Sequence, residues 1–419
     1  MRTIFARHAI AEGREQASVS LTIEDGRFTE VRESSEPAGA DFVLNDGILI
    51  PGLIDLQVNG YHGTDLSHAD GAGWQRIARR LPETGVTAFA AAFVTAPVPT
   101  LAEALRRCGK AMNAPTYTTQ ARLLGAHLEG PFLSPAHPGA HDAGFFRDPE
   151  PGHIRALLDA APPGTLAVIT LAPERLHALA AIETLASAGV LVSIGHTDAN
   201  AAETRAAVDA GARMVTHLYN AQRPFHHRDP GVIGQALVDA RVSVSLVLDG
   251  HHISSQAAAM AFGMAGERLV LVTDAVAAAG IAPGRYRLGS RSIHAEKGRP
   301  PTLANGAFAG STLRLDHALA NAVQLGLPLL DAVAATTSRP ADLLARPDLG
   351  RIEVGAHADL VWLNDSLETK ATWVGGEPAF AIPGALAGGR PNTPTSFQGN
   401  ETMCHHQPPS TSQPPGGAA

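Results

Sequence analysis

Residues 47–58 read GILIPGLIDLQV, a largely apolar run that decides the fold. A strand with one face in water alternates apolar and polar residues, whereas a strand buried on both faces stays apolar throughout. The second part of the run, residues 54–58, therefore predicts a strand of a parallel sheet that is covered on both sides.

Further runs of the same kind follow, and helical stretches separate most of them. The runs lie at residues 86–94, 123–128, 166–171, 190–194, 213–216, 242–248 and 269–273. The intervening helical stretches include residues 74–81, 100–112, 176–187 and 201–210. Strands that alternate with helices in this number predict an α/β fold, a (β/α)8 TIM-like barrel, over residues 51–349.

A small β domain is expected from the two ends of the chain. An antiparallel sheet ahead of the barrel is predicted by short alternating segments at residues 19–23, 28–32 and 42–44. Residues 355–363 and 371–376 read as strands after the barrel, and we expect them to return and complete that sheet. The predicted β-sandwich domain therefore comprises residues 1–50 and 350–385.

Composition and charge exclude several classes of protein. The formal net charge is -8, so neither nucleic acid nor an anionic membrane is an expected partner. Cys108 and Cys404 stand too far apart in sequence to indicate a disulfide framework or a thiolate metal site. No apolar run is long enough to span a bilayer, and no secretory signal is recognisable, so we expect a cytoplasmic enzyme. Residues 388–419 are rich in Pro, Gly, Ser, Thr and Gln and are expected to be disordered.

Ionisable side chains come directly after several of the apolar runs. These side chains are Glu129, His196, His217, Asp249 and Asp274. The catalytic residues of a (β/α)8 barrel come from the carboxyl ends of its strands, so we expect these groups to meet at one mouth of the barrel. A buried ionisable group is costly unless it is paired or bound to a metal, so packing alone does not explain the pattern.

Three of these side chains predict a metal centre. Two imidazoles and one carboxylate form a common open zinc site, which leaves a coordination position for water or substrate. Glu129, His196 and His217 supply that set from different strands. Each histidine taken singly could be an ordinary hydrogen-bonded residue at the barrel mouth, but the whole set favours a metal. Iron or another divalent ion accepts the same ligands as zinc.

Asp274 follows the last predicted barrel strand and is expected to lie across the site from the metal. A carboxylate in that place can take a proton from the attacking water and later return it to the leaving amine. The alternative is that Asp274 caps the N-terminus of the Ala-rich segment that follows it.

Positive charge is concentrated in residues 223–228, RPFHHR, of an otherwise acidic chain. The guanidinium of Arg228 offers paired donors that suit a phosphate, so the segment favours an anionic substrate. A merely solvated basic loop is the alternative, because most charge runs are surface features.

The motifs around these residues resemble those of the N-acetylglucosamine-6-phosphate deacetylases, a branch of the amidohydrolase superfamily. The matching stretches run in the family's order and are PGLIDLQVNG (51–60), HLEGPF (127–132), GAHD (139–142), GHTDA (195–199), THLYNA (216–221), DPG (229–231), LDGHH (248–252), LVTDA (271–275) and AGST (309–312). Together they are specific, whereas any one alone would be weak. The resemblance implies hydrolysis of the N-acetyl amide of N-acetyl-D-glucosamine 6-phosphate, giving D-glucosamine 6-phosphate and acetate.

The resemblance also implies roles for individual residues. Glu129, His196 and His217 match the family's metal ligands, and Asp274 matches its general base and acid. His141 matches the histidine that contacts the scissile carbonyl and helps to stabilise the oxyanion. The positions that match substrate contacts are Ala140, His141, Asn220, Ala221, Arg228, His252, Phe308, Ala309 and Gly310. In the family this arginine reaches in from the neighbouring subunit, so the resemblance implies a homodimer in which Arg228 completes the neighbouring active site.

Two departures from the wider pattern bear on the metal and on specificity. Many amidohydrolases carry His-x-His on the first barrel strand for a second metal, but this chain has Gln57 and Asn59, as does one subgroup of the family. We therefore predict one divalent ion per subunit. Ala140 replaces the usual Thr or Ser before His141, which leaves the choice of sugar epimer open.

Two rival functions stay open. A related amidohydrolase on the same barrel could act on N-acetylgalactosamine 6-phosphate or another N-acylated substrate, although a dipeptidase has no need of the basic segment at residues 223–228. A catalytically silent barrel that senses a sugar phosphate is the second rival. Nothing in the sequence favours it, because the candidate ligands and Asp274 are all present.

Overall fold

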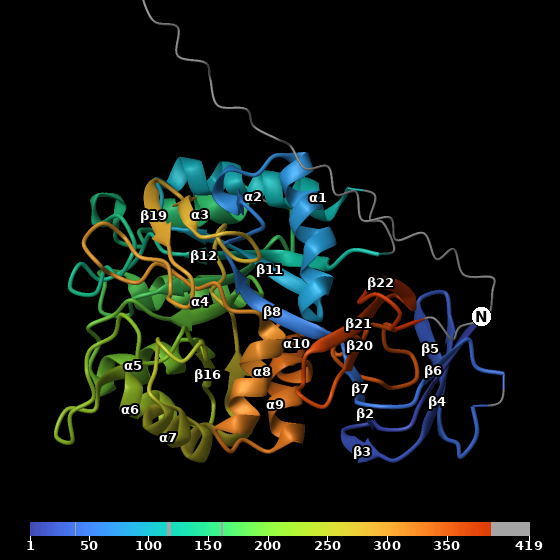
Figure 1. Cartoon of the computed structure of the whole chain (residues 1–419). Coiled ribbons are helices and arrows are strands. Elements are labelled where there is room, and N and C mark those ends of the chain that lie inside the picture. Colours follow the sequence, from blue (N-terminus) through green and yellow to red (C-terminus); the bar gives the residue numbers. More distant parts are fainter. Residues whose placement is uncertain (38, 115–118, 161, 387–419) are drawn as a thin grey trace, which may run out of the picture.

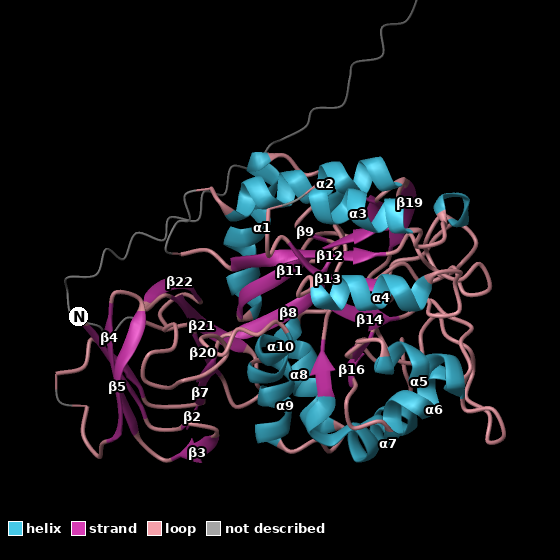
Figure 2. Ribbon diagram, turned by 180° about the vertical axis from the view of Figure 1, so that it is seen from behind, coloured by secondary structure: helices cyan, strands magenta, loops and turns pink. Residues whose placement is uncertain are grey.

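A barrel of eight parallel strands forms the larger part of the molecule, and helices surround it (Figure 1, Figure 2). The structure is a computed structural model that describes residues 1–37, 39–114, 119–160 and 162–386, so the tail at 388–419 lies outside the described residues. In spatial order the barrel strands are β8 (Leu53–Val58), β11 (Val86–Val94), β12 (Arg122–Glu129), β13 (Leu166–Leu171), β14 (Leu191–Ile194), β15 (Met214–Val215), β16 (Ser243–Leu246) and β17 (Leu269–Leu271). The predicted (β/α)8 barrel is confirmed.

The barrel strands are buried as a sheet covered on both faces requires. Every residue of β8 and β13 is buried. Strands β15 and β17 are shorter than the apolar runs that predicted them, because the backbone leaves the sheet just before His217 and Asp274. The same departure turns these side chains toward the barrel mouth.

The barrel closes where the region after β17 meets β8. A parallel bridge joins Val58 to Ala275, and the backbone N–H of Asn59 donates to the carbonyl of Ala275 at 2.8 Å. A side-chain hydrogen bond also joins the two sides of this seam. In it, Oγ1 of Thr273 donates to Oδ2 of Asp55 at 2.6 Å. Burial raises the pKa of Asp55 to about 7. This closure brings Asn59 close to residue 274.

Helices pack around the barrel. They are α1 (Gly71–Arg80), α2 (Val98–Met112), α3 (Pro151–Asp159), α4 (Ala178–Ser187), α5 (Ala201–Asp209), α6 (Gly231–Val238), α7 (Ser255–Ala265), α8 (Leu315–Gln324), α9 (Leu329–Thr336) and α10 (Ser338–Leu343). Side chains cap the first turns of α1, α5 and α7. The predicted stretch at 74–81 starts three residues earlier as α1, because Asp70 caps it by accepting from the N–H of Gly73. In the part of the chain that is described, no helix has the length and apolarity to cross a membrane.

Two further sheets from both ends of the chain lie beside the barrel, at the right of Figure 1. The first contains, in order, β5 (Arg27–Glu33), β4 (Val19–Glu24), β1 (Arg2–Ala6) and β6 (Phe42–Leu44). The second contains β22 (Glu377–Ala381), β21 (Thr369–Val374), β20 (Leu360–Leu363), β7 (Ile48–Pro51), β2 (Ala9–Ala11) and β3 (Arg14–Gln16). Between them lies a separate apolar core, in which Trp373 packs edge-on against Phe42 with ring centroids 5.7 Å apart.

Two short antiparallel strand pairs are inserted after barrel strands. Strands β9 (Gly60–Tyr61) and β10 (Thr64–Asp65) form one antiparallel pair after β8. Strands β18 (Gly284–Leu288) and β19 (Arg291–Ala295) form another after β17. The second pair has its own small apolar cluster and contributes to the wall of the barrel mouth.

The small sheets differ from the predicted arrangement in two ways. Strand β6 pairs with β1 in parallel, so the first sheet is not wholly antiparallel. The C-terminal strands do not complete that sheet, because β20 pairs with β7 in the second one. Alternation of apolar residues identifies the buried face of a strand but not its neighbour, so the sequence could not settle the pairing.

We propose that residues 1–50 and 350–385 form a domain of their own, with the barrel over 51–349. The separate core between the two terminal sheets supports this division. Strand β7 connects the two units, because Leu49 faces the small core while Ile48 and Ile50 face the core of the barrel.

Candidate metal centre and active site

Most of the ionisable side chains that follow the barrel strands meet in one cavity of about 380 Å³, but Asp249, which follows β16, does not line it. Glu129 ends β12, and the other groups lie just past the ends of β14, β15 and β17. The predicted site residues that line the cavity are Glu129, Ala140, His141, His196, His217, Asn220, Ala221, His252, Asp274, Phe308 and Gly310. The structure thus brings together, at one end of the barrel, side chains that lie far apart in the sequence.

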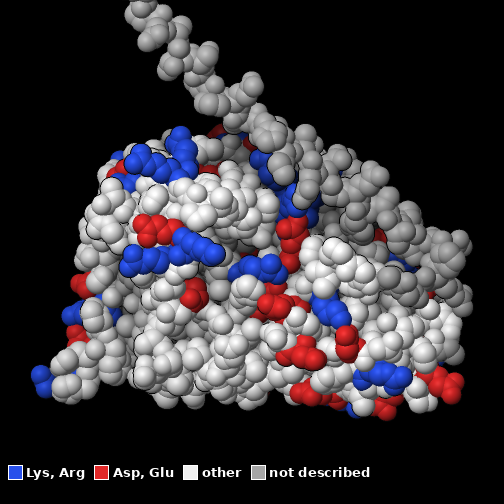
Figure 3. All heavy atoms as spheres, viewed as in Figure 1, with Lys and Arg blue, Asp and Glu red and all other residues white. Residues whose placement is uncertain are grey.

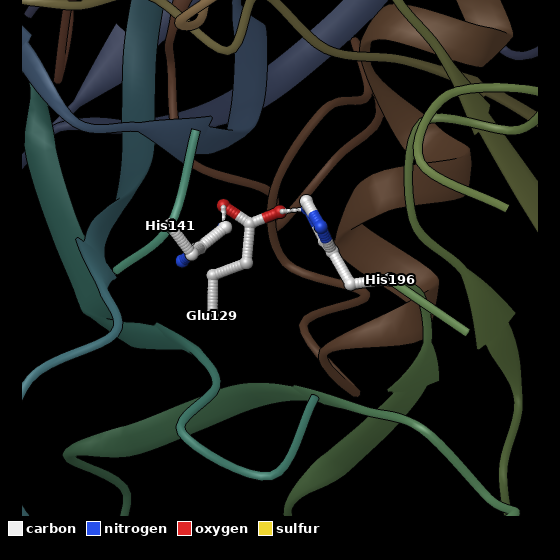
Figure 4. Close-up of side chains that lie close together, drawn as sticks. All are labelled: Glu129, His141 and His196. Atoms are coloured by element: carbon white, nitrogen blue, oxygen red, sulfur yellow. Dashed lines mark hydrogen bonds and ion pairs between the residues drawn. The ribbon is translucent and has the colours of Figure 1, made fainter. Parts of the chain in front are cut away.

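Glu129 lies at the centre of a group of imidazoles (Figure 4). Its Oε1 is 3.2 Å from Nε2 of His196 and 2.8 Å from Nε2 of His217. Its Oε2 is 3.6 Å from Nε2 of His141. All four side chains are buried. Figure 4 shows the carboxylate between the rings of His141 and His196, which come from different segments of the chain.

The electrostatics of this group favour a positive charge. Although burial opposes its ionisation, hydrogen bonds from His141 and His217 hold the pKa of Glu129 well below its usual range. Burial also works against a charged His217, yet the hydrogen bond and charge of Glu129 raise its pKa. Among the described residues, only histidines form ion pairs with Glu129. A buried carboxylate with no Lys or Arg partner is suited to a cation.

The ring of His196 is oriented as a ligand. Its Nδ1 lies 3.0 Å from the carbonyl oxygen of His137, which can only accept, so Nδ1 carries the proton and Nε2 keeps its lone pair. Burial, and then the charge of His141, lower the pKa of His196 to about 4, so the ring is neutral near pH 7. The Nε2 lone pair of His196 and Oε1 of Glu129 are therefore two acceptors that face each other, as ligands of one cation do.

His141 has the opposite tautomer. The backbone N–H of Thr95 donates to its Nδ1 at 3.1 Å, so a neutral ring carries its proton on Nε2. Glu129, His141 and His196 have potential ligand atoms within 4.8 Å of one another. The tautomers nevertheless separate the two histidines, since His196 offers a lone pair to the cavity and His141 offers an N–H donor.

Asp274 is buried at the barrel seam beside two amides. Its Oδ1 accepts from Nδ2 of Asn59 at 2.6 Å and from Nε2 of Gln57 at 3.2 Å. Burial, and then the charge of Glu129, raise the pKa of Asp274 to about 6. No helix begins in the segment after Asp274, so the capping alternative is wrong. A Cβ at Gly310 would lie 2.6 Å from the carbonyl oxygen of Asp274, so only glycine permits this close approach.

Non-glycine residues of the site with backbone in the left-handed region include Ala221 and three ionisable residues. The φ angles of His196, His217 and Asp274 are 48°, 30° and 51°. Such angles cost a non-glycine residue on the order of 1–3 kcal/mol each and persist only where the surroundings enforce them. The strain falls on the turns that aim these side chains into the cavity.

Two predicted substrate contacts do not line the cavity. Ala309 is fully buried in the cluster around β18 and β19, and Arg228 is exposed on the segment that leads into α6. In Figure 1 this segment projects from the body of the molecule at the lower left.

Sequence reasoning missed part of the wall. Residues of the cavity that were not predicted include Val94, Ala136, His137, Pro138, Leu288 and Ala307. The backbone carbonyl of His137 accepts a hydrogen bond from His196. Every residue has such a carbonyl, so the residue type at position 137 gives no sign of this role. The small apolar residues could have been found only by predicting how the loops fold over the mouth.

The fold and the site define a class of protein, a (β/α)8 barrel with a candidate metal centre at the carboxyl ends of its strands. Residues 48–391 match the model of the Amidohydrolase family. The chain belongs to the amidohydrolase family.

Individual relatives are similar to this chain in sequence over most of their own length. The N-acetylglucosamine-6-phosphate deacetylase of Vibrio furnissii is 34% identical over 90% of this chain and 94% of its own. The N-acetylgalactosamine-6-phosphate deacetylase of Escherichia coli O157:H7 is 36% identical over 86% of this chain and 94% of its own. A mutant N-acetyl-D-glucosamine-6-phosphate deacetylase of Mycobacterium smegmatis, solved in complex with N-acetyl-D-glucosamine-6-phosphate, superposes with a TM-score of 0.86 at 35% identity and covers 91% of this chain and 99% of its own.

Proposed function

We propose that this chain hydrolyses the N-acetyl amide of N-acetyl-D-glucosamine 6-phosphate to D-glucosamine 6-phosphate and acetate. The observation that carries the proposal is the single cavity in which Glu129, three histidines and Asp274 converge with complementary tautomers. The names of the relatives from Vibrio furnissii and Mycobacterium smegmatis support the choice of substrate.

A single divalent cation, zinc in our proposal, would be held by Glu129, His196 and His217. When bound, it would supply the positive charge that polarises the amide carbonyl and activates water. Gln57 and Asn59 direct amide N–H groups at Asp274, which supports one ion rather than two because an N–H group cannot be a ligand.

Asp274 and His141 would perform the proton transfer and charge stabilisation. As the water oxygen bonds to the acetyl carbon, Asp274 accepts the water proton. The Nε2–H of His141 donates to the carbonyl oxygen as negative charge develops there. The C–N bond then breaks, Asp274 returns the proton to the nitrogen, and the amine and acetate separate.

An acetate-release assay on a small panel of substrates tests the proposed function. We expect rapid release from N-acetyl-D-glucosamine 6-phosphate and at least about tenfold lower kcat/KM for the sugar without phosphate, which lacks charge-assisted contacts. Equal rates with and without the phosphate would contradict the proposal. The panel also includes N-acetyl-D-galactosamine 6-phosphate, because the Escherichia coli relative favours that epimer as the second candidate.

We further propose a homodimer in which Arg228 completes the neighbouring active site. Arg228 is exposed and its guanidinium lies 2.9 Å from Nε2 of His227, away from the cavity of its own subunit. Figure 3 shows Lys or Arg atoms that protrude at the lower left edge of this face of the molecule. Phe225 on the same segment as Arg228 is 52% exposed, and in this arrangement it would pack against the partner subunit. A cytoplasmic location stays a prediction.

Mixed dimers of Arg228→Ala and Asp274→Asn chains test this arrangement. Each variant alone is expected to be nearly inactive at low substrate concentration. After random reassortment, half of the dimers are mixed and each has one intact site, so activity should recover to about a quarter of the wild-type value. If Arg228 acts within its own subunit, every mixed dimer stays defective and no activity returns.

A further inference from the structure

Asp249 is an ionisable residue at a strand end that the proposed reaction does not use. It follows β16, and its side chain is largely buried. Its Oδ1 accepts from the backbone N–H groups of His251 and His252, both at 2.9 Å. Its Oδ2 accepts from Nδ1 of His252 at 2.7 Å. Both carboxylate oxygens are therefore fixed in direction.

His252 stands between Asp249 and the substrate cavity. The ring of His252 lines the cavity and packs at 5.3 Å against the ring of Phe308, which also lines it. Asp249 does not line the cavity and contacts the ring from behind. The turn is held in place from α8, because Nδ2 of Asn321 donates to the carbonyl of Leu248 at 2.7 Å.

We propose that Asp249 is a positioning residue that makes His252 a cationic donor for the 6-phosphate of the substrate. The proposal rests on the proposed function, which supplies the phosphate. Because Nδ1 donates to Asp249, the opposite nitrogen, Nε2, is the ring atom left for the cavity. In the described part of the chain Nε2 makes no hydrogen bond.

The carboxylate determines what Nε2 can do. A neutral ring with its proton on Nδ1 would present a lone pair to the phosphate, which is repulsive. A carboxylate at Nδ1 stabilises the protonated ring, in which Nε2–H donates to the phosphate with a positive charge behind it. Asp249 thus fixes the orientation of a ring that faces the substrate, although Asp249 itself does not contact the substrate.

The Asn variant separates charge from geometry. In Asp249→Asn the backbone N–H groups of His251 and His252 keep the amide oxygen in the place of Oδ1, so the amide NH₂ faces Nδ1 of His252. The ring then becomes a neutral Nε2–H donor that keeps its hydrogen bond but loses its charge. We expect KM for the phosphorylated substrate to rise roughly tenfold, since a charge-assisted bond is about twice as strong as a neutral one. Asp249→Ala also frees the ring, and the rise should approach 100-fold.

A double-mutant cycle with His252→Gln tests the mechanism. Asp249→Asn should raise KM in the wild-type background and leave it unchanged in the His252→Gln background, with kcat little affected in either. A general structural defect would instead lower kcat together with the rise in KM, so the ratio of the two effects separates positioning from misfolding. His251→Gln is the matched control, because that exposed side chain lies outside the cavity and its substitution should have no effect.

The possible results are distinguishable. A wild-type protein that does not prefer the phosphorylated sugar overturns the proposed function, and this inference falls with it. A wild-type protein with that preference, together with an Asp249→Asn variant that keeps a normal KM, overturns only the positioning role. An equal effect of Asp249→Asn in both backgrounds also overturns it, because the carboxylate would then act independently of His252.

Discussion

Replacement of Asp274 by Asn is expected to lower kcat by roughly 10³-fold or more, because one group serves as base and then as acid. The amide is similar in shape, so the protein should fold, bind its cation and bind substrate. Acetate release measured in a single turnover, with metal content determined on the same sample, tests this expectation. Retained turnover with a full complement of metal would show that another group carries the proton.

The same variant provides a check on the fold that does not depend on catalysis. Burial raises the pKa of Asp274 to about 6, so the ionised carboxylate destabilises the metal-free protein above that pH. Below the ordinary carboxyl pKa of about 3.9 the group is protonated in both states and this cost is absent. Metal-free Asp274→Asn should therefore unfold at a higher temperature than metal-free wild type at pH 8, and the difference should shrink as the pH falls toward 4.

Removal of the cation by a chelator is expected to reduce turnover to background, and one equivalent of zinc per chain should restore it. The reason is that Glu129, His196 and His217 can polarise the substrate only through a bound positive charge. The core of the barrel consists of apolar side chains and does not depend on the cation, so circular dichroism should change little.

Glu129→Gln is the matched variant for the metal, because it keeps the size of the side chain and removes the charge that the imidazoles surround. It should bind zinc at least about tenfold more weakly and lose activity in proportion to the metal lost. Full activity after exhaustive chelation would refute the metal-dependent mechanism. Two equivalents of metal per chain at full activity would refute the single-ion site.

Much of the barrel could be predicted because a strand buried on both faces is a continuous run of apolar residues in the sequence. The run at 86–94 coincides with β11, and the run at 166–171 coincides with β13. The ends were less predictable where the backbone turns into the left-handed region, as at His217 and Asp274. A side-chain pattern does not reveal such turns in advance.

The convergence of Glu129, His196 and His217 could be predicted because parallel strands deliver their carboxyl ends to one mouth. His141 does not follow a barrel strand, so only the family resemblance indicated it. The difference between His141 and His196 could not be predicted at all, since it depends on the backbone N–H of Thr95 and the backbone carbonyl of His137. Backbone groups are the same in every sequence.

The left-handed turns at His196, His217 and Asp274 have a consequence for engineering this barrel. Glycine adopts these angles without penalty, so a library screened only for heat tolerance would be enriched in glycine at these positions and depleted in working enzyme. Thermostabilising designs should therefore hold these three positions fixed and look for their gains on the outer helices.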